Sequence, residues 1–130
     1  MSRASKVFAF RLDPASGVPV YRQLIDQVQA GIASGSLASG DQLPTVRQVA
    51  VDLAINPNTV MRAYRELEIR GVIDTEHGTG TFIADRKQPR DSAERARQLE
   101  QLATEFAARA GTLGFTVQQL IEKLQEKGRK

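Results

Sequence analysis

The stretch from Asp52 to Gly71, DLAINPNTVMRAYRELEIRG, contains the end of one predicted helix, a tight turn and a second predicted helix. In the second helix the apolar residues recur at i, i+3, i+4 and i+7, which is the spacing of a single buried face. They are Val60, Ala63, Tyr64 and Leu67. The pattern therefore predicts a helix that packs against a core on one side only.

The opposite face of this helix is polar. It carries Asn58, Arg62 and Arg65, and Asn56 and Thr59 stand at the helix start. Amide, hydroxyl and guanidinium groups are the side chains that hydrogen-bond to base edges and phosphates, so the face is typical of a helix that recognises DNA. An ordinary solvated helix has the same charge pattern. The neighbouring segments have to decide between these two interpretations.

The preceding segment supplies a partner helix. Thr45 is a natural N-cap, and Gln48 completes a capping box. Arg47 lies in the first turn, where a cation opposes the helix dipole, so a phosphate partner explains it at least as well as solvation does. Asn56 as N-cap and Pro57 at the first position start the next helix after a short turn. Such a turn forces a steep crossing, as in a helix-turn-helix.

A β-hairpin is predicted after the second of these helices. Gly71 suits a helix C-terminus, and β-prone residues 72–75 and 81–83 flank the segment His77–Gly80. Its glycines permit the positive φ of a tight turn. A hairpin in this place is a wing with its tip near the phosphate backbone or the minor groove, although His77 alone fits an ordinary polar turn equally well. The glycines do not form a nucleotide-binding loop, because no helix follows them.

The segments on the N-terminal side are less distinctive. Residues 7–12 alternate in polarity and predict a short strand or an extended arm. Pro19 at the first helical position and the apolar spacing that follows predict a helix over residues 20–33. The segment beginning at Leu37 is expected to start with a polar loop.

Composition excludes several classes of function. Cys is absent and His occurs once, so disulfides, metal sites and cofactors are not expected. No enzymatic activity is expected either, because the chain offers no nucleophile and base and no convergent carboxylate pair. There is no apolar run long enough for a membrane span or a signal peptide, which predicts a cytoplasmic protein without a membrane partner.

The net charge of +3 is unevenly distributed. Residues 1–85 hold eight Lys or Arg against nine Asp or Glu, and residues 86–130 hold ten against six. DNA affinity would therefore depend on a few placed cations rather than on a general positive field. These cations are Arg47, Arg62, Arg65, Arg86, Lys87 and Arg90. The near-neutral first part leaves open a winged-helix module that binds protein and not DNA.

The run from Leu37 to Ala84 resembles the winged helix-turn-helix domain of the GntR family of bacterial transcription regulators. The resemblance rests on GDQLPTVRQVA, NPNTVMRAYRELE and GTGTF. It implies a protein that binds double-stranded DNA. The implied contacts are Arg47, Asn58, Thr59 and Arg62 in the major groove, Thr45 at a phosphate, His77 and Gly78 in the minor groove, and Asn56 as a further candidate. Ala54 stands where family members often have Gly, and a left-handed conformation there would cost on the order of 1 kcal/mol.

Two helices are predicted in the remaining residues. Asp91 with Glu94 forms a capping box for a helix ended by Gly111, and Thr116 with Gln119 opens another. This tail is similar to the short C-terminal domain of the YtrA subfamily. Two helices cannot enclose a metabolite and also bury their own apolar faces, so we expect dimerisation across a two-fold axis. The residues expected at this interface are Leu99, Leu102, Phe106, Leu120, Ile121 and Leu124. Packing against the chain's own winged domain is the alternative.

The expected fold class is α+β, mainly α. Residues 1–84 are assigned to the winged helix-turn-helix, 85–91 to a linker and 92–130 to a helical dimerisation domain. We expect a sequence-specific repressor that binds a pseudo-palindromic operator as a homodimer. The sequence does not identify a small-molecule effector.

Overall fold

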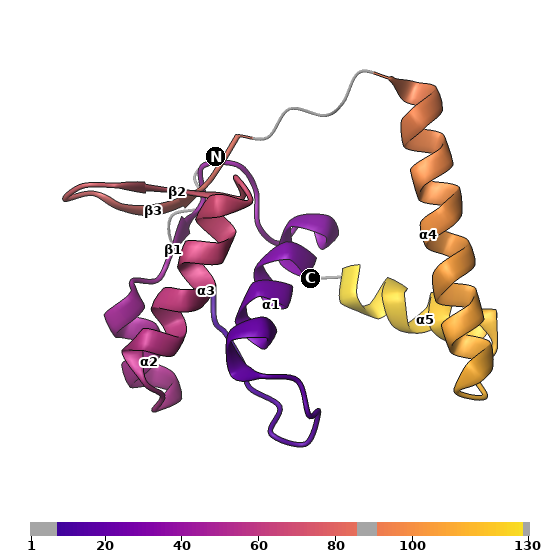
Figure 1. Cartoon of the computed structure of the whole chain (residues 1–130), viewed down its shortest axis with the longest axis horizontal. Coiled ribbons are helices and arrows are strands. Elements are labelled where there is room, and N and C mark those ends of the chain that lie inside the picture. The colour runs from indigo at the N-terminus through magenta and orange to yellow at the C-terminus, as the bar shows by residue number, and fades with distance from the viewer. Residues whose placement is uncertain (1–7, 86–90, 129–130) are drawn as a thin grey trace. The chain divides into compact units, whose positions relative to one another are not determined.

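The computed structural model describes residues 8–85 and 91–128. The chain divides into two compact units, one within residues 1–86 and one within residues 87–130. Among the described residues, the first unit holds three helices and a small sheet, and the second holds two helices (Figure 1). The architecture is thus mainly helical with a minor β component, in agreement with the predicted α+β class.

Three helices form the body of the first unit. They are α1 (Val20–Ser34), α2 (Val46–Leu53) and α3 (Pro57–Ile69). Both α1 and α2 pack against α3. The predicted apolar face of α3 is the centre of this packing, because Val60, Ala63 and Leu67 are fully buried. Burial of apolar surface on this face is the main source of stability for so small a unit.

A three-stranded antiparallel sheet completes the first unit. Its strands are β1 (Gln42–Leu43), β2 (Ile73–Glu76) and β3 (Gly80–Ile83), in the order β1-β3-β2. Thr75 lies opposite Thr81, and Gln42 lies opposite Phe82. Strand β1 was not predicted, because the segment from Leu37 was expected to begin as a polar loop. Two residues are too few to show an alternating pattern, and β1 forms only because β3 supplies its hydrogen-bond partners.

The N-terminal arm of the described chain is extended and lies along α1. Phe10 is buried in the core, and Phe8 meets it edge to face with ring centroids 5.0 Å apart. The side-chain amide of Gln27 accepts from the Arg11 N–H at 2.9 Å and donates to the Arg11 carbonyl. Gln27 thus pairs with the arm as a neighbouring strand would. Of the predicted arm, Val7 lies outside the described residues.

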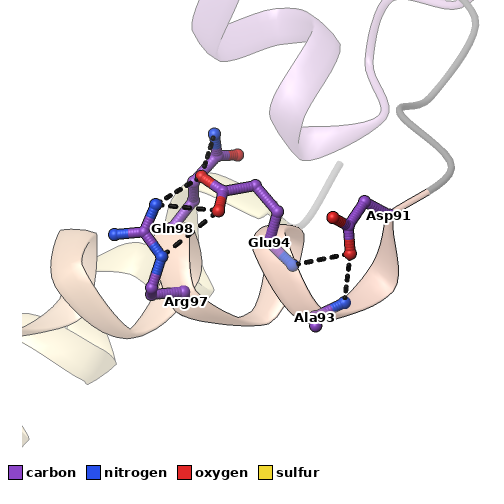
Figure 2. Close-up of polar contacts among 5 residues, drawn as sticks. All are labelled: Asp91, Ala93, Glu94, Arg97 and Gln98. Atoms are coloured by element: carbon purple, nitrogen blue, oxygen red, sulfur yellow. Dashed lines mark hydrogen bonds and ion pairs between the residues drawn. The ribbon is translucent and has the colours of Figure 1, made fainter.

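The second unit is a helical hairpin of α4 (Ser92–Thr112) and α5 (Val117–Gly128). The Asp91 carboxylate caps α4 by accepting from the N–H groups of Ala93 and Glu94, both at 3.1 Å (Figure 2). The Glu94 side chain does not complete the predicted capping box. It accepts instead from Arg97 at 2.6 Å and from Gln98 at 3.3 Å. A charged pair one turn away competes successfully with a neutral backbone donor.

Two predicted boundaries are wrong. Helix α4 does not end at Gly111 but continues to Thr112, and Gly114, with φ +86°, provides the left-handed turn. Glycine is tolerated inside a helix, so its position alone does not mark the end. Pro19 is the N-cap of α1 and not its first helical residue. The second predicted capping box is confirmed, because Thr116 and Gln119 exchange hydrogen bonds of 2.8 and 3.1 Å.

Candidate nucleic-acid interface

The recognition-type helix α3 has well-defined ends. The Asn56 side chain caps its start by accepting from the Asn58 N–H at 2.8 Å, and Pro57 occupies the first turn, as predicted. At the other end Gly71 adopts φ +75°. There the Val72 N–H reaches the Leu67 carbonyl at 2.9 Å, which is the hydrogen bond of a Schellman motif. These two motifs define the ends of a helix of 13 residues.

The shorter helix α2 begins with the predicted capping box. Thr45 Oγ1 accepts from the Gln48 N–H at 3.1 Å, and Gln48 Oε1 accepts from the Thr45 N–H at 2.9 Å. With both side chains committed to the cap, the exposed Arg47 in the first turn projects from a fixed helix end. A cation near the N-terminal end of a helix gains nothing from the helix dipole. Its placement fits a phosphate or base partner better than a role in local stability.

The turn between α2 and α3 depends on Ala54. This residue has φ 56° and ψ 49°, and it is the only described residue other than glycine with positive φ. The Ile55 N–H donates to the Ala50 carbonyl at 3.0 Å, which closes the end of α2. Ala54 thus adopts the left-handed conformation, and the steric cost considered for it is retained in the fold.

A second constraint joins the two helices. The Tyr64 hydroxyl of α3 donates to the Pro44 carbonyl at 2.6 Å, just before α2 begins. Tyr64 is buried, and desolvation raises the pKa of its phenol. The neutral hydroxyl is the form that donates this bond. The first turn of α2, and with it Arg47, is therefore held at a defined place beside α3.

The outer face of α3 is exposed, as predicted. Asn58, Arg62 and Arg65 are exposed, and Thr59 is half-buried beside the core. Within the described part of the chain, no ion pair or hydrogen bond engages the side chains of Asn58 and Arg65. Glu66, the carboxylate nearest this face in sequence, is paired with Arg70 at 3.0 Å. Asn58 and Arg65 thus present side-chain donors that no described carboxylate engages.

One contact on this face was not anticipated from the sequence. The Arg62 guanidinium carbon lies 3.7 Å from the centre of the Tyr21 ring, which belongs to the first turn of α1. Tyr21 is half-buried against the core. No local pattern links the two residues, because they meet only when α1 packs on α3. Tyr21 was therefore not among the residues predicted for the site.

The wing is a hairpin whose turn is formed by residues 77–79 (Figure 1). The Thr79 N–H donates to the Glu76 carbonyl at 3.0 Å, and Gly78 has φ +74°. His77 and Gly78 are exposed at the tip, where the hairpin was predicted to place them. The Gln42 side chain of β1 donates to the Thr79 carbonyl at 3.3 Å and packs over Gly80. Gln42 thus supports the wing, a role that the sequence did not indicate.

The helical hairpin of the second unit leaves its apolar residues uncovered. Leu99, Leu102, Phe106, Ile121 and Leu124 are 39–68% exposed, and Leu120 is half-buried. Among the described side chains of residues 91–127, only Ala110 is buried. A groove of about 580 Å³ follows α4 and α5, with Phe106, Leu113 and Phe115 on its apolar lining. Helices α4 and α5 therefore leave most of their apolar side chains exposed when they pack against each other.

Other kinds of site find little support in the described part of the molecule. Over residues 8–85 and 91–128, no group of three or more His, Asp or Glu side chains is placed to hold a metal ion. None of the described helices is long and apolar enough to cross a membrane. The predicted cations Arg86, Lys87 and Arg90 lie outside the described residues.

Comparison with known proteins agrees with this geometry. The sequence profile of the family "Bacterial regulatory proteins, gntR family" matches residues 20–83, from the start of α1 to the end of the wing. The HTH-type transcriptional regulator Rv1152 of Mycobacterium tuberculosis is 42% identical over 106 residues, which cover 82% of this chain and 83% of the relative. The chain belongs to the gntR family. Its winged helix-turn-helix is accordingly the DNA-binding part of a transcription regulator, and the protein-interaction alternative loses its support.

Two further relatives carry the name YtrA. The HTH-type transcriptional repressor YtrA of Bacillus subtilis is 44% identical over 75 residues, and the match spans 58% of each chain. The solved structure of YtrA from Sulfolobus acidocaldarius, a GntR-family transcription factor, superposes with a TM-score of 0.55 at 30% identity. It covers 74% of this chain and 99% of that chain. Similarity to the YtrA group within the gntR family is thus established.

Proposed function

We propose that this gntR-family regulator is a repressor that works in the cytoplasm as a homodimer on a pseudo-palindromic operator. Residues 1–84 would bind DNA, residues 92–130 would form the dimer, and residues 85–91 would link these two parts. It would act by binding alone, without a cofactor and without catalysis. The similar repressor of Bacillus subtilis supports the sign of regulation.

The observation that carries this proposal is the outer face of α3. Asn58, Arg62 and Arg65 are exposed there, opposite the fully buried Val60 and Leu67. A helix with one buried face and one face of amide and guanidinium donors suits the major groove, where such groups read base edges. The short connection through Ala54 and the hydrogen bond from Tyr64 to Pro44 hold the start of α2, which carries Arg47, close to α3.

We assign the contacts according to chemistry and position. Arg47 and Arg62 would read bases, Asn58 and Thr59 would contact base edges or phosphates from the start of α3, and Asn56 would assist them. Thr45 would hold a phosphate, because its hydroxyl oxygen accepts a helix N–H while its O–H can still donate to a phosphate oxygen. His77 and Gly78 would bring the wing tip to the minor groove.

Dimerisation is supported by the uncovered apolar residues of α4 and α5. Leu99 is 68% exposed and Leu124 is 58% exposed, on a hairpin that buries almost none of its own side chains. Apolar surface of this extent usually marks a protein interface. A second copy of this chain is the occupant we propose, because a two-fold operator calls for a two-fold protein.

Selection of bound DNA from a random pool by the full chain tests the proposal. The selected sequences should contain two inverted half-sites about one or more helical turns apart. On the selected operator, Arg62→Ala and Asn58→Ala should each cost roughly 1–3 kcal/mol of binding free energy, and much less on random DNA. Arg95→Ala, which removes an exposed cation of α4, serves as the matched control and should leave the operator preference unchanged.

Two results would contradict the proposal. A single, unrepeated half-site would remove the two-fold dimer. Equal losses on operator and random DNA, measured at one salt concentration, would reassign Arg62 to phosphate positioning.

A further inference from the structure

The stack of Arg62 on Tyr21 joins a side chain of the DNA-facing helix to the helix behind it. The guanidinium carbon is 3.7 Å from the ring centre. Tyr21 is half-buried against the core, in the first turn of α1, whereas Arg62 is exposed. The ring is therefore the fixed member of the pair, and the arginine side chain is the member whose freedom the contact restricts.

The geometry of a stacked guanidinium leaves its binding edge available. A planar guanidinium uses its face for the ring and keeps its N–H donors in the plane. Those in-plane donors form the fork that pairs with O6 and N7 of guanine. No carboxylate among the described residues forms an ion pair with Arg62. Stacking is thus compatible with base recognition, whereas an ion pair would compete with it.

A long side chain loses rotamer freedom when it binds, and this loss weakens binding. A ring that already restricts Arg62 in the free protein reduces that loss. The ring acts on a single side chain, so its effect should appear at the one base pair that Arg62 contacts. A residue that merely supports the fold would affect all positions of the operator alike.

We propose that Tyr21 is a positioning residue for specificity, which holds the Arg62 guanidinium edge-on for one guanine in each half-site. The proposal rests on the proposed function, since it requires Arg62 to contact a base. The phenol hydroxyl takes no part, because the stack uses the ring alone. Tyr21 thereby connects α1 to base selection without itself touching the base.

The test compares binding of the full chain to the selected operator, to the same operator with each base pair changed in turn, and to random DNA. Tyr21→Met keeps a long apolar side chain without the ring and should lower operator affinity about two- to fivefold, with the loss confined to one guanine position. Tyr21→Phe keeps the ring and should match the unmodified chain. In an Arg62→Ala background, Tyr21→Met should have no further effect. Thermal unfolding of each variant checks that the fold is kept, and Tyr21→Leu replaces Tyr21→Met if the latter does not fold.

Several outcomes overturn the proposal, and they separate it from the proposed function. If Arg62→Ala relaxes one position but Tyr21→Met lowers affinity evenly at all positions, Tyr21 is structural and Arg62 remains the base reader. If Tyr21→Phe is as weak as Tyr21→Met, the effect comes from the hydroxyl and not from the stack. If Arg62→Ala leaves every position unchanged while operator binding persists, the assignment of Arg62 fails, and the role of Tyr21 fails with it.

Discussion

Ala54 adopts a conformation that suits glycine better than alanine. Its φ of 56° puts the Cβ close to the following carbonyl oxygen, yet the end of α2 requires this turn. The backbone strain at Ala54 is thus the cost of the turn between α2 and α3. A glycine at this position would relieve the strain and leave the turn itself in place.

Ala54→Gly should raise the free energy of unfolding by roughly 0.5–1 kcal/mol, since relief of the left-handed strain exceeds the entropy that glycine adds to the unfolded chain. Urea unfolding at neutral pH measures the change. The matched control is Ala30→Gly, at an exposed position inside α1, which should lower stability by about 1 kcal/mol. A loss of stability in Ala54→Gly comparable to that of the control would show that the turn is not strained.

Tyr64 links stability to pH at the alkaline end. Its buried phenol has a raised pKa, so the stability it contributes is complete below the ordinary tyrosine pKa of about 10 and is lost as the pH rises above that value. Tyr64→Phe removes the hydrogen bond to Pro44 and should cost roughly 1 kcal/mol at pH 7. Between about pH 9 and 11 the variant should lose less stability than the unmodified chain. If both proteins lose the same amount of stability over this pH range, other titrating groups cause the alkaline loss.

At the scale of elements, the two helix starts of the helix-turn-helix are set by side chains close in sequence. Thr45 with Gln48, and Asn56 with Asn58, form their hydrogen bonds within three residues. Such caps function in any context that leaves the helix start exposed, which explains why they were predicted correctly. The predicted capping box at Glu94 did not form, because the Glu94 carboxylate pairs with Arg97 and not with the backbone at the helix start.

Thr45→Ala should lower the free energy of unfolding by about 1 kcal/mol, because one reciprocal bond of the capping box is lost. Thr45→Ser keeps the hydroxyl and should recover most of the loss. Thermal unfolding followed by circular dichroism gives both values. If the serine variant is as unstable as the alanine variant, the threonine methyl and not its hydroxyl stabilises the start of α2.

At the scale of the whole molecule, the proposed dimer would bring two copies of the chain to one operator through the apolar residues of α4 and α5. Leu124→Asp places a charge on the uncovered face of α5. Because Leu124 is 58% exposed in the single chain, the variant should still fold. Sedimentation should then give a species of 14.3 kDa, the mass of one chain. Operator affinity should fall by roughly a hundredfold through lost bivalency. Gln118→Asp, at an exposed polar position of the same helix, should stay dimeric. A dimeric Leu124→Asp would move the interface elsewhere.

Local patterns sufficed for much of the candidate site. The apolar spacing of α3, the caps at Thr45 and Asn56 and the glycines of the wing all act over a few residues, so the helix-turn-helix and its exposed polar face could be predicted from them. The uncovered apolar residues of α4 and α5 were likewise visible at helical spacing. The family resemblance singled out Ala54 as a position where glycine is common, but its left-handed conformation is known only from the structure.

Contacts between distant segments were beyond such patterns. Strand β1 needs β3 beside it, the Gln42 support of the wing needs both strands, and the hydrogen bond from Tyr64 to Pro44 needs α3 against α2. The stack of Arg62 on Tyr21 exists only because α1 and α3 share a core. The amino-acid sequence by itself thus determined which helices form and which of their faces are polar, because those properties depend on nearest neighbours along the chain. Only the tertiary structure decided how the polar side chains are held, because that depends on residues which packing alone brings together.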